Sequence, residues 1–211
     1  EALTVENIQQ VIEDFRLAAI RSRKAGFQVL EIHAAHGYLL HQFYSPLSNQ
    51  RKDAYGGSFE NRIRLLLEIV AAVLEVWPSD LPIMVRISAT DWTPGGWDLS
   101  DSVLLAGKLK EQGVHLIDCS SGGNVPHAKI PAGPGYQVEF ARQIKMQTGI
   151  LTGAVGFITE AEQAEQILKE GSADLILMAR EMLRDPYFPL HAASQLQHEM
   201  EWPVQYQRAK K

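Results

Sequence analysis

The sequence of 211 residues contains one cysteine, Cys119, and that scarcity limits what can hold the chain together. A single cysteine cannot form an internal disulfide, so the fold must rest on a hydrophobic core. Hydrophobic residues make up 45% of the chain, which is enough for a substantial core. Cys119 lies in the apolar run HLIDCS and is expected to be a small core residue.

Long apolar runs and an excess of basic residues are also missing. No run reaches the roughly 18 residues that would suggest a membrane span, and none resembles the apolar region of a signal peptide. The formal net charge is -5 and the signs are interspersed, which argues against nucleic acid as a partner. We therefore expect a cytoplasmic protein that binds small molecules, with no membrane or nucleic-acid partner.

Apolar periodicity predicts an alternation of helices and strands. A helix begins after Thr4 and stops at Gly26, and another runs from Ser58 to Pro78. The strands are predicted over 27–32, 83–88, 115–120, 150–155 and 173–179. Two later helices are predicted over 100–112 and 136–147. A third begins at a capping box formed by Thr159 and Glu162 and ends at Gly171, and a last helical segment follows the sequence RDP.

This alternation predicts an α/β fold with a parallel sheet, either doubly wound or a (β/α)8 TIM barrel. The barrel is favoured because histidine, arginine, serine and glycine cluster after successive strands, and because a G-x-G-x-x-G motif is absent. A closed barrel needs eight strands and about 250 residues. We therefore interpret residues 1–211 as a single domain, the C-terminal portion of a barrel that lacks its first strands.

Two histidines and a tyrosine follow the first predicted strand. On a continuing strand His33 and His36 would face opposite sides, so only a turn beginning near Ala34 can direct both to one point. Two neutral imidazoles there can polarise a carbonyl, and Tyr38 can supply a proton. One alternative is a metal site formed by His33, His36 and His41, although no H-E-x-x-H motif or cysteine partner supports it. The other is a set of ordinary hydrogen-bonded histidines.

Arg86 lies inside the apolar strand IMVRIS, and a buried guanidinium needs an anionic or strongly accepting partner. One possibility is a salt bridge to Asp118 or Glu31 on a neighbouring strand. The other is an electron-rich cofactor ring in the mouth of the barrel.

The last two predicted strands end in TGAVG and MAR, where barrels commonly form a phosphate site from backbone N–H groups. Gly156 and Ala179 allow close approach of the backbone. Arg180 can pair with a phosphate through two hydrogen bonds, although a salt bridge to Glu181 or Asp185 would also explain it.

Together these residues resemble the old yellow enzyme family, in the branch of thermophilic-like ene-reductases. The resemblance covers essentially the whole chain and rests on EIHAAHGYLLHQFYSPLSNQRKDAYGGSFENRIRLLLEI, VRIS, DCSSG, TGAVG, ARE with LRDP, and PVQY. The segment SPLSNQRKDAYGGSFENR is its most specific part. The resemblance implies FMN as cofactor, NADPH as reductant, and hydride transfer from flavin N5 to the β-carbon of an α,β-unsaturated carbonyl.

The resemblance also implies a role for each matching residue. His33 and His36 match the pair that holds the substrate carbonyl, and Tyr38 matches the tyrosine that protonates the α-carbon. Arg86 matches the arginine at the flavin N1 and O2 edge. The phosphate site is matched by Gly156, Ala179 and Arg180, with glycine usual in place of Ala179.

Arg208 resembles an arginine that reaches across a dimer interface into the neighbouring active site. Here Ala209 and Lys210 replace the usual glycine–tryptophan ending, so a solvated basic tail is the other interpretation. The resemblance further implies enones as substrates, phenols as inhibitors, and a homodimer or homotetramer when the barrel is complete.

Two other functions fit part of the sequence. A flavin barrel of the dienoyl-CoA reductase type would need an iron–sulfur cluster, whose cysteine ligands this chain lacks. An inactive partial-barrel scaffold would bind partners through its open edges without binding flavin alone.

Overall fold

The computed structural model describes residues 2–210 and contains one sheet of five parallel strands. The strands are β1 (Leu30–Ala34), β2 (Ile83–Ser88), β3 (Leu116–Ser120), β4 (Leu151–Ala154) and β5 (Leu175–Ile176). They lie side by side in chain order, from β1 to β5. A doubly wound sheet would reverse its order at a switch point, so this sequential order identifies part of a (β/α)8 barrel.

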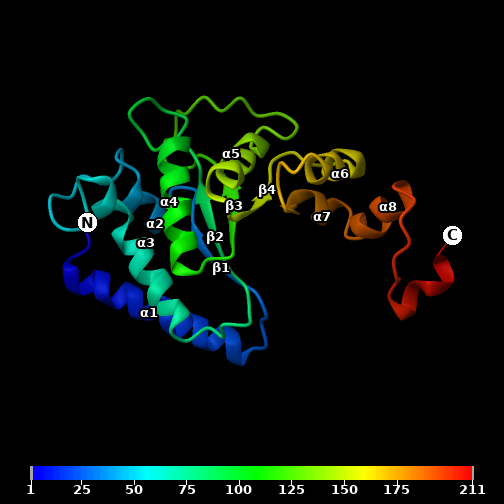
Figure 1. Cartoon of the computed structure of the whole chain (residues 1–211), viewed down its shortest axis with the longest axis horizontal. Coiled ribbons are helices and arrows are strands. Elements are labelled where there is room, and N and C mark those ends of the chain that lie inside the picture. Colours follow the sequence, from blue (N-terminus) through cyan, green and yellow to red (C-terminus); the bar gives the residue numbers. More distant parts are fainter. Residues whose placement is uncertain (1, 211) are drawn as a thin grey trace.

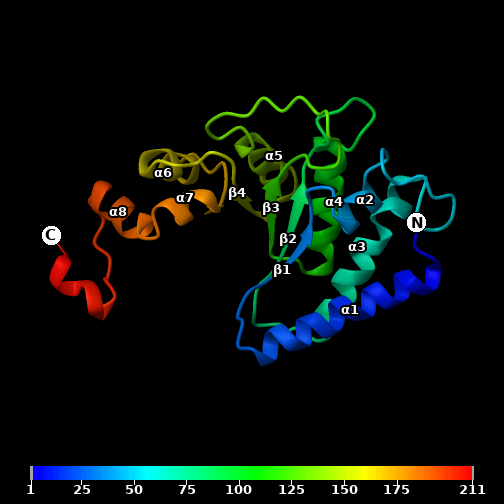
Figure 2. The ribbon, with the colours of Figure 1, turned by 180° about the vertical axis from the view of Figure 1, so that it is seen from behind.

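Four helices follow one another along one side of this sheet (Figures 1 and 2). They are α1 (Val5–Lys24), α3 (Phe59–Leu74), α4 (Leu99–Gln112) and α5 (Val138–Thr148). Helix α1 packs on α3, α3 on α4, and α4 on α5. The remaining helices are α2 (Leu39–Tyr44), α6 (Ala161–Lys169), α7 (Arg180–Arg184), α8 (Phe188–Gln195) and the 3-10 helix η1 (Val204–Ala209).

The strands alternate between a buried face toward the helices and a polar inner face. On the helix side the side chains are fully or almost fully buried, among them Ile32, Val85, Ile87, Ile117 and Cys119. The intervening residues of β1 and β2, such as Glu31, His33 and Arg86, lie on the other face and remain partly exposed. The hydrophobic core therefore lies between sheet and helices, and the chemistry-bearing side chains lie on the inner face.

Local sequence signals explain most of the helix ends. Thr4 and Ser58 cap α1 and α3 by accepting hydrogen bonds from backbone N–H groups three residues later. Asp98 caps α4 in the same way, and Gly113 ends that helix in the left-handed conformation at φ 103°.

Several predicted boundaries are wrong. The first strand begins at Leu30 rather than 27, because Phe27 and Val29 are 62% and 51% exposed and pairing starts only where Leu30 meets β2. The capping box at Thr159 is also wrong, because α6 is capped by Glu160 without a side-chain hydrogen bond.

Three further differences concern the length or the presence of an element. The last strand is two residues long instead of spanning 173–179, and helix α3 ends at Leu74, three residues before the buried Trp77. Helix α2 lies between the first predicted strand and the helix predicted from Ser58, where the sequence pattern indicated no helix.

Candidate active site

The predicted turn after β1 is present and begins after Ala34. His33 is the penultimate residue of β1, whereas His36 has a positive φ of 59° that few residues other than glycine adopt. The His36 backbone N–H donates to Ser88 Oγ at 2.9 Å, which ties the turn to the end of β2. Gly37 continues the turn with φ 75°.

This turn brings three rings together at the carboxyl end of the sheet. The ring centroids of His33 and His36 are 5.2 Å apart, and those of His33 and Tyr38 are 5.5 Å apart. His36 Nε2 lies 2.7 Å from Ser120 Oγ at the end of β3. Tyr38 is 65% exposed, so its hydroxyl is accessible to a small molecule.

Both histidines are held in the neutral form. Burial and the nearby Arg86 lower the pKa of His36 to about 4, and the same two causes lower the pKa of His33. A neutral imidazole has one N–H donor and one lone pair. Two such rings on one side of the sheet can each donate a hydrogen bond to a single substrate oxygen.

Arg86 lies beside His33 in the strand register and pairs with Asp118 on the next strand. The Arg86 Nε to Asp118 Oδ2 distance is 3.2 Å, so the predicted salt bridge is confirmed. Within residues 2–210, however, Arg86 Nε and both Asp118 carboxylate oxygens are buried without an aligned hydrogen bond. The ion pair therefore leaves hydrogen-bonding capacity unused on the inner face.

Asp118 is fully buried and lies close to Glu31. Burial and contact with Glu31 raise the pKa of Asp118 to about 7, against the opposing effect of Arg86. Burial also raises the pKa of Glu31. Two carboxyl groups in contact disfavour ionisation of both, which is the direction in which contact with Glu31 shifts the pKa of Asp118.

The three residues predicted for a phosphate site line one small cavity of about 100 Å³. Gly156 has φ 119°, and a Cβ there would lie 2.8 Å from side-chain atoms of Gln137 and Tyr136, so only glycine fits. Ala179 precedes α7, and the Arg180 guanidinium lies 5.4 Å from the centroid of the Phe157 ring.

The alternative salt bridges of Arg180 do not form. In the described part of the chain Glu181 pairs with Arg184, and Asp185 pairs with His191. The Arg180 guanidinium therefore keeps its donors for another group.

Other predicted residues lie away from this site. Arg208 lies on η1, in the C-terminal segment at the end of the molecule away from α1 (Figure 1). Cys119 is completely buried, and burial raises the pKa of its thiol well above the ordinary value. Among residues 2–210 no group of three potential metal ligands exists, and His41 faces Asp91 instead of His33 and His36.

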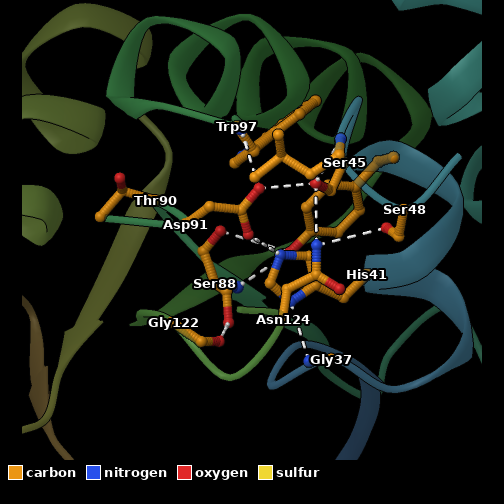
Figure 3. Close-up of polar contacts among 12 residues, drawn as sticks. Gly37, His41, Ser45, Ser48, Ser88, Thr90, Asp91, Trp97, Gly122 and Asn124 are labelled. Atoms are coloured by element: carbon orange, nitrogen blue, oxygen red, sulfur yellow. Dashed lines mark hydrogen bonds and ion pairs between the residues drawn. The ribbon is translucent and has the colours of Figure 1, made fainter. Parts of the chain in front are cut away.

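A buried polar network that the sequence pattern did not indicate lies behind the turn, as Figure 3 shows. Its centre is the pair His41 and Asp91, whose side chains are both fully buried. The sequence signal was the position of Asp91 three residues after the end of β2, where a barrel places polar residues.

Polar side chains at the carboxyl ends of parallel barrel strands define the catalytic face of an α/β-barrel enzyme. The model of the NADH:flavin oxidoreductase / NADH oxidase family matches residues 1–199. The chain therefore belongs to that flavin oxidoreductase family.

Two curated relatives are NADPH dehydrogenases. That of Bacillus subtilis (strain 168) is 54% identical over 206 residues, which are 98% of this chain and 60% of the relative. That of Halalkalibacterium halodurans is 54% identical over 209 residues, covering 99% of this chain and 61% of the relative. The chain thus spans about three fifths of the length of these relatives.

Solved structures share the fold. The complex of 2-naphthoyl-CoA reductase with 2-naphthoyl-CoA superposes with a TM-score of 0.86 at 27% identity, over 92% of this chain and 30% of that chain. Morphinone reductase in complex with tetrahydroNAD gives a TM-score of 0.76 at 29% identity, over 96% and 53%. No helix among residues 2–210 is long and apolar enough to cross a membrane.

Proposed function

We propose that residues 1–211 are the C-terminal portion of a barrel enzyme, an FMN-dependent NADPH dehydrogenase that reduces α,β-unsaturated carbonyls. The observation that carries this proposal is the cluster of His33, His36 and Tyr38 beside Arg86 on the inner face. Family membership and the NADPH dehydrogenases at 54% identity support it.

The described residues fit FMN at two points. Arg86 has a buried Nε without an aligned partner, which suits the electron-rich N1 and O2 edge of a flavin. The cavity lined by Gly156, Ala179 and Arg180 suits its phosphate. When bound, FMN would supply the hydride for the substrate β-carbon after reduction by NADPH.

The chain's own residues would bind and orient the substrate. His33 and His36 each donate an N–H to the carbonyl oxygen, which gains negative charge in the transition state. Tyr38 then delivers a proton to the α-carbon from its accessible hydroxyl. We include in this proposal phenolic inhibitors at the same two histidines, and a homodimer or homotetramer of the complete barrel.

The test of this proposal is flavin binding followed by turnover. After incubation with FMN and removal of excess, the protein should show a flavin absorbance band and should oxidise NADPH with cyclohexenone present. Absence of both would overturn the proposal and leave a scaffold that does not bind flavin.

Single substitutions then test the two histidines. H33A and H36A should each raise the Kd for a phenol about tenfold, since each removes one hydrogen bond to an anionic oxygen. The Kd is followed by the charge-transfer band of the bound phenol, and FMN should stay bound in both variants. H198A changes an exposed histidine near the C-terminal end and serves as control. A full-strength phenol band in either site variant would contradict the polarising role.

A further inference from the structure

The buried network behind the turn fixes the proton on the His41 ring. The Gly37 backbone N–H donates to His41 Nδ1 at 2.9 Å, and His41 Nε2 lies 2.9 Å from Asp91 Oδ1 (Figure 3). A backbone N–H is only a donor, so Nδ1 must carry the lone pair. The ring proton is therefore on Nε2 and is donated to Asp91.

Asp91 is fully satisfied in this arrangement. Its second oxygen, Oδ2, accepts from Ser45 Oγ at 2.6 Å and from the Trp97 backbone N–H at 2.9 Å. Burial pushes the pKa of Asp91 upward, but the hydrogen bonds from His41, Ser45 and Trp97 outweigh it and hold the pKa below its ordinary value. The buried carboxylate therefore stays charged and keeps the His41 tautomer fixed.

The same network reaches the loops after three strands. Ser45 lies just after α2, Asp91 follows β2, and Asn124 follows β3 and donates to Ser45 Oγ at 2.9 Å. Next to Asn124, a Cβ on Gly123 would lie 2.5 Å from the His36 Cα, so the loop after β3 packs directly on the turn. The segments that surround the turn are thus joined to the same hydrogen-bond network that binds the Gly37 N–H.

From this geometry we propose that His41, whose tautomer Asp91 fixes, is a positioning residue for the turn 35–38, and so for the side chains of His36 and Tyr38. The inference rests on the proposed function. His41 adds no group to the substrate site, because both of its ring nitrogens are used inside the network. A buried carboxylate held by hydrogen bonds is weak evidence for stability alone, whereas a fixed orientation of the turn requires its directional bonds.

Two substitutions at one position separate orientation from packing. Asparagine at position 41 places Oδ1 on Cγ, where histidine has Nδ1, so H41N keeps an acceptor for the Gly37 N–H but loses the bond to Asp91. H41L fills the space and removes both bonds. If the Gly37 bond orients the turn, H41N should recover most of what H41L loses.

His115 offers a matched control at the other end of the sheet. Its Nδ1 accepts the Ile83 backbone N–H at 3.2 Å, at the start of β2. H115L therefore removes the same kind of bond far from the turn. Any effect shared by H41L and H115L would reflect general destabilisation.

With FMN bound, H41L should weaken phenol binding by about tenfold, since small misplacements of binding groups cost that much or more. The phenol affinity of H41N should stay within about threefold of the wild-type value, and that of H115L should equal the wild-type value. A kcat/KM for cyclohexenone that falls in the same order would support the inference. Wild-type phenol affinity in H41L, or an equal loss in H115L, would overturn it.

A second measurement does not depend on flavin. Proton–nitrogen NMR of the histidine rings should show His41 protonated at Nε2 only, and H41L should displace the ring signals of His36 where H115L does not. If the wild type takes up no FMN, the proposed function fails while these spectra still decide the inference. Unchanged His36 signals in H41L, or a proton on His41 Nδ1, would overturn it.

Discussion

His36 combines two features that cost free energy, a positive φ and a partly buried imidazole that resists protonation. Residues other than glycine rarely adopt this conformation, and such strain persists only where the surroundings impose it. Here the hydroxyl groups of Ser88 and Ser120 hold its backbone and its ring. The cost is consistent with a residue placed for binding rather than for stability.

The lowered pKa of His36 predicts that acid weakens the fold. The pKa falls from 6.5 to about 4 on folding, so between these pH values the unfolded chain binds more protons than the folded chain. The contribution of His36 to the free energy of unfolding should be complete above pH 6.5 and should decrease as pH falls toward 4. When the free energy of unfolding is measured by urea denaturation across that range, its slope against pH should be shallower in H36N than in the wild type.

The control for this experiment is H198N, at an exposed position, which should keep the wild-type slope. Because His36 is only half-buried, we expect the difference to be smaller than one full proton's contribution of about 1.4 kcal/mol per pH unit. Identical slopes in H36N and the wild type would show that His36 does not titrate in this window.

Among the elements, the loop after β3 restricts the turn after β1 most directly. Gly123 has φ 94° and approaches the His36 backbone more closely than any side chain would allow. G123A should therefore displace the turn and lower the free energy of unfolding by about 1–3 kcal/mol. Gly133 lies in the same connection, and a Cβ added there would have no atom within 4 Å, so G133A should leave stability unchanged in urea denaturation. Equal effects of the two would exclude the close contact as the cause.

Much of this architecture could be predicted from apolar periodicity. All five strands and the helices α1, α3, α4 and α5 overlap the ranges that the pattern indicated, because each buries an apolar face against the next layer. Helix α2 was missed because its buried residues include His41, which reads as polar in a sequence. The ends of short strands depend on their neighbours, so periodicity cannot locate them.

The candidate site was predictable to a similar degree. The turn at His33 and His36 followed from their spacing, and the pairing of Arg86 with Asp118 followed from adjacent strands. The contact between His41 and Asp91 joins residues 50 positions apart, and no local pattern indicates it. Long-range polar pairs of this kind require the fold before they can be recognised.

Across the whole molecule, the sequential strand order leaves β1 and β5 at the edges of the described sheet. The central strands β2 and β3 have a neighbour on both sides, and their helix-facing residues are fully buried. Strand β5 has two residues, one of them Leu175 at 48% exposure. Protection should therefore decrease from the centre of the sheet toward β5.

Native-state hydrogen exchange should show this gradient. The amides of Val85 and Ile117 should exchange only through global unfolding, whereas Ile176 should exchange through local opening with a much smaller denaturant dependence. Equal protection at Ile176 would mean that another segment covers the β5 edge. Ligand-dependent protection there on addition of FMN would link that edge to the phosphate cavity.

The lone thiol of Cys119 gives the protein a built-in reporter. It lies completely buried in the middle strand of the sheet, and no second sulfhydryl among residues 1–211 competes with it. A thiol reagent can reach it only when the sheet separates from its helices. The rate of covalent labelling therefore measures how often the unaltered protein opens, and the same reading can be taken for every variant described above without engineering a probe.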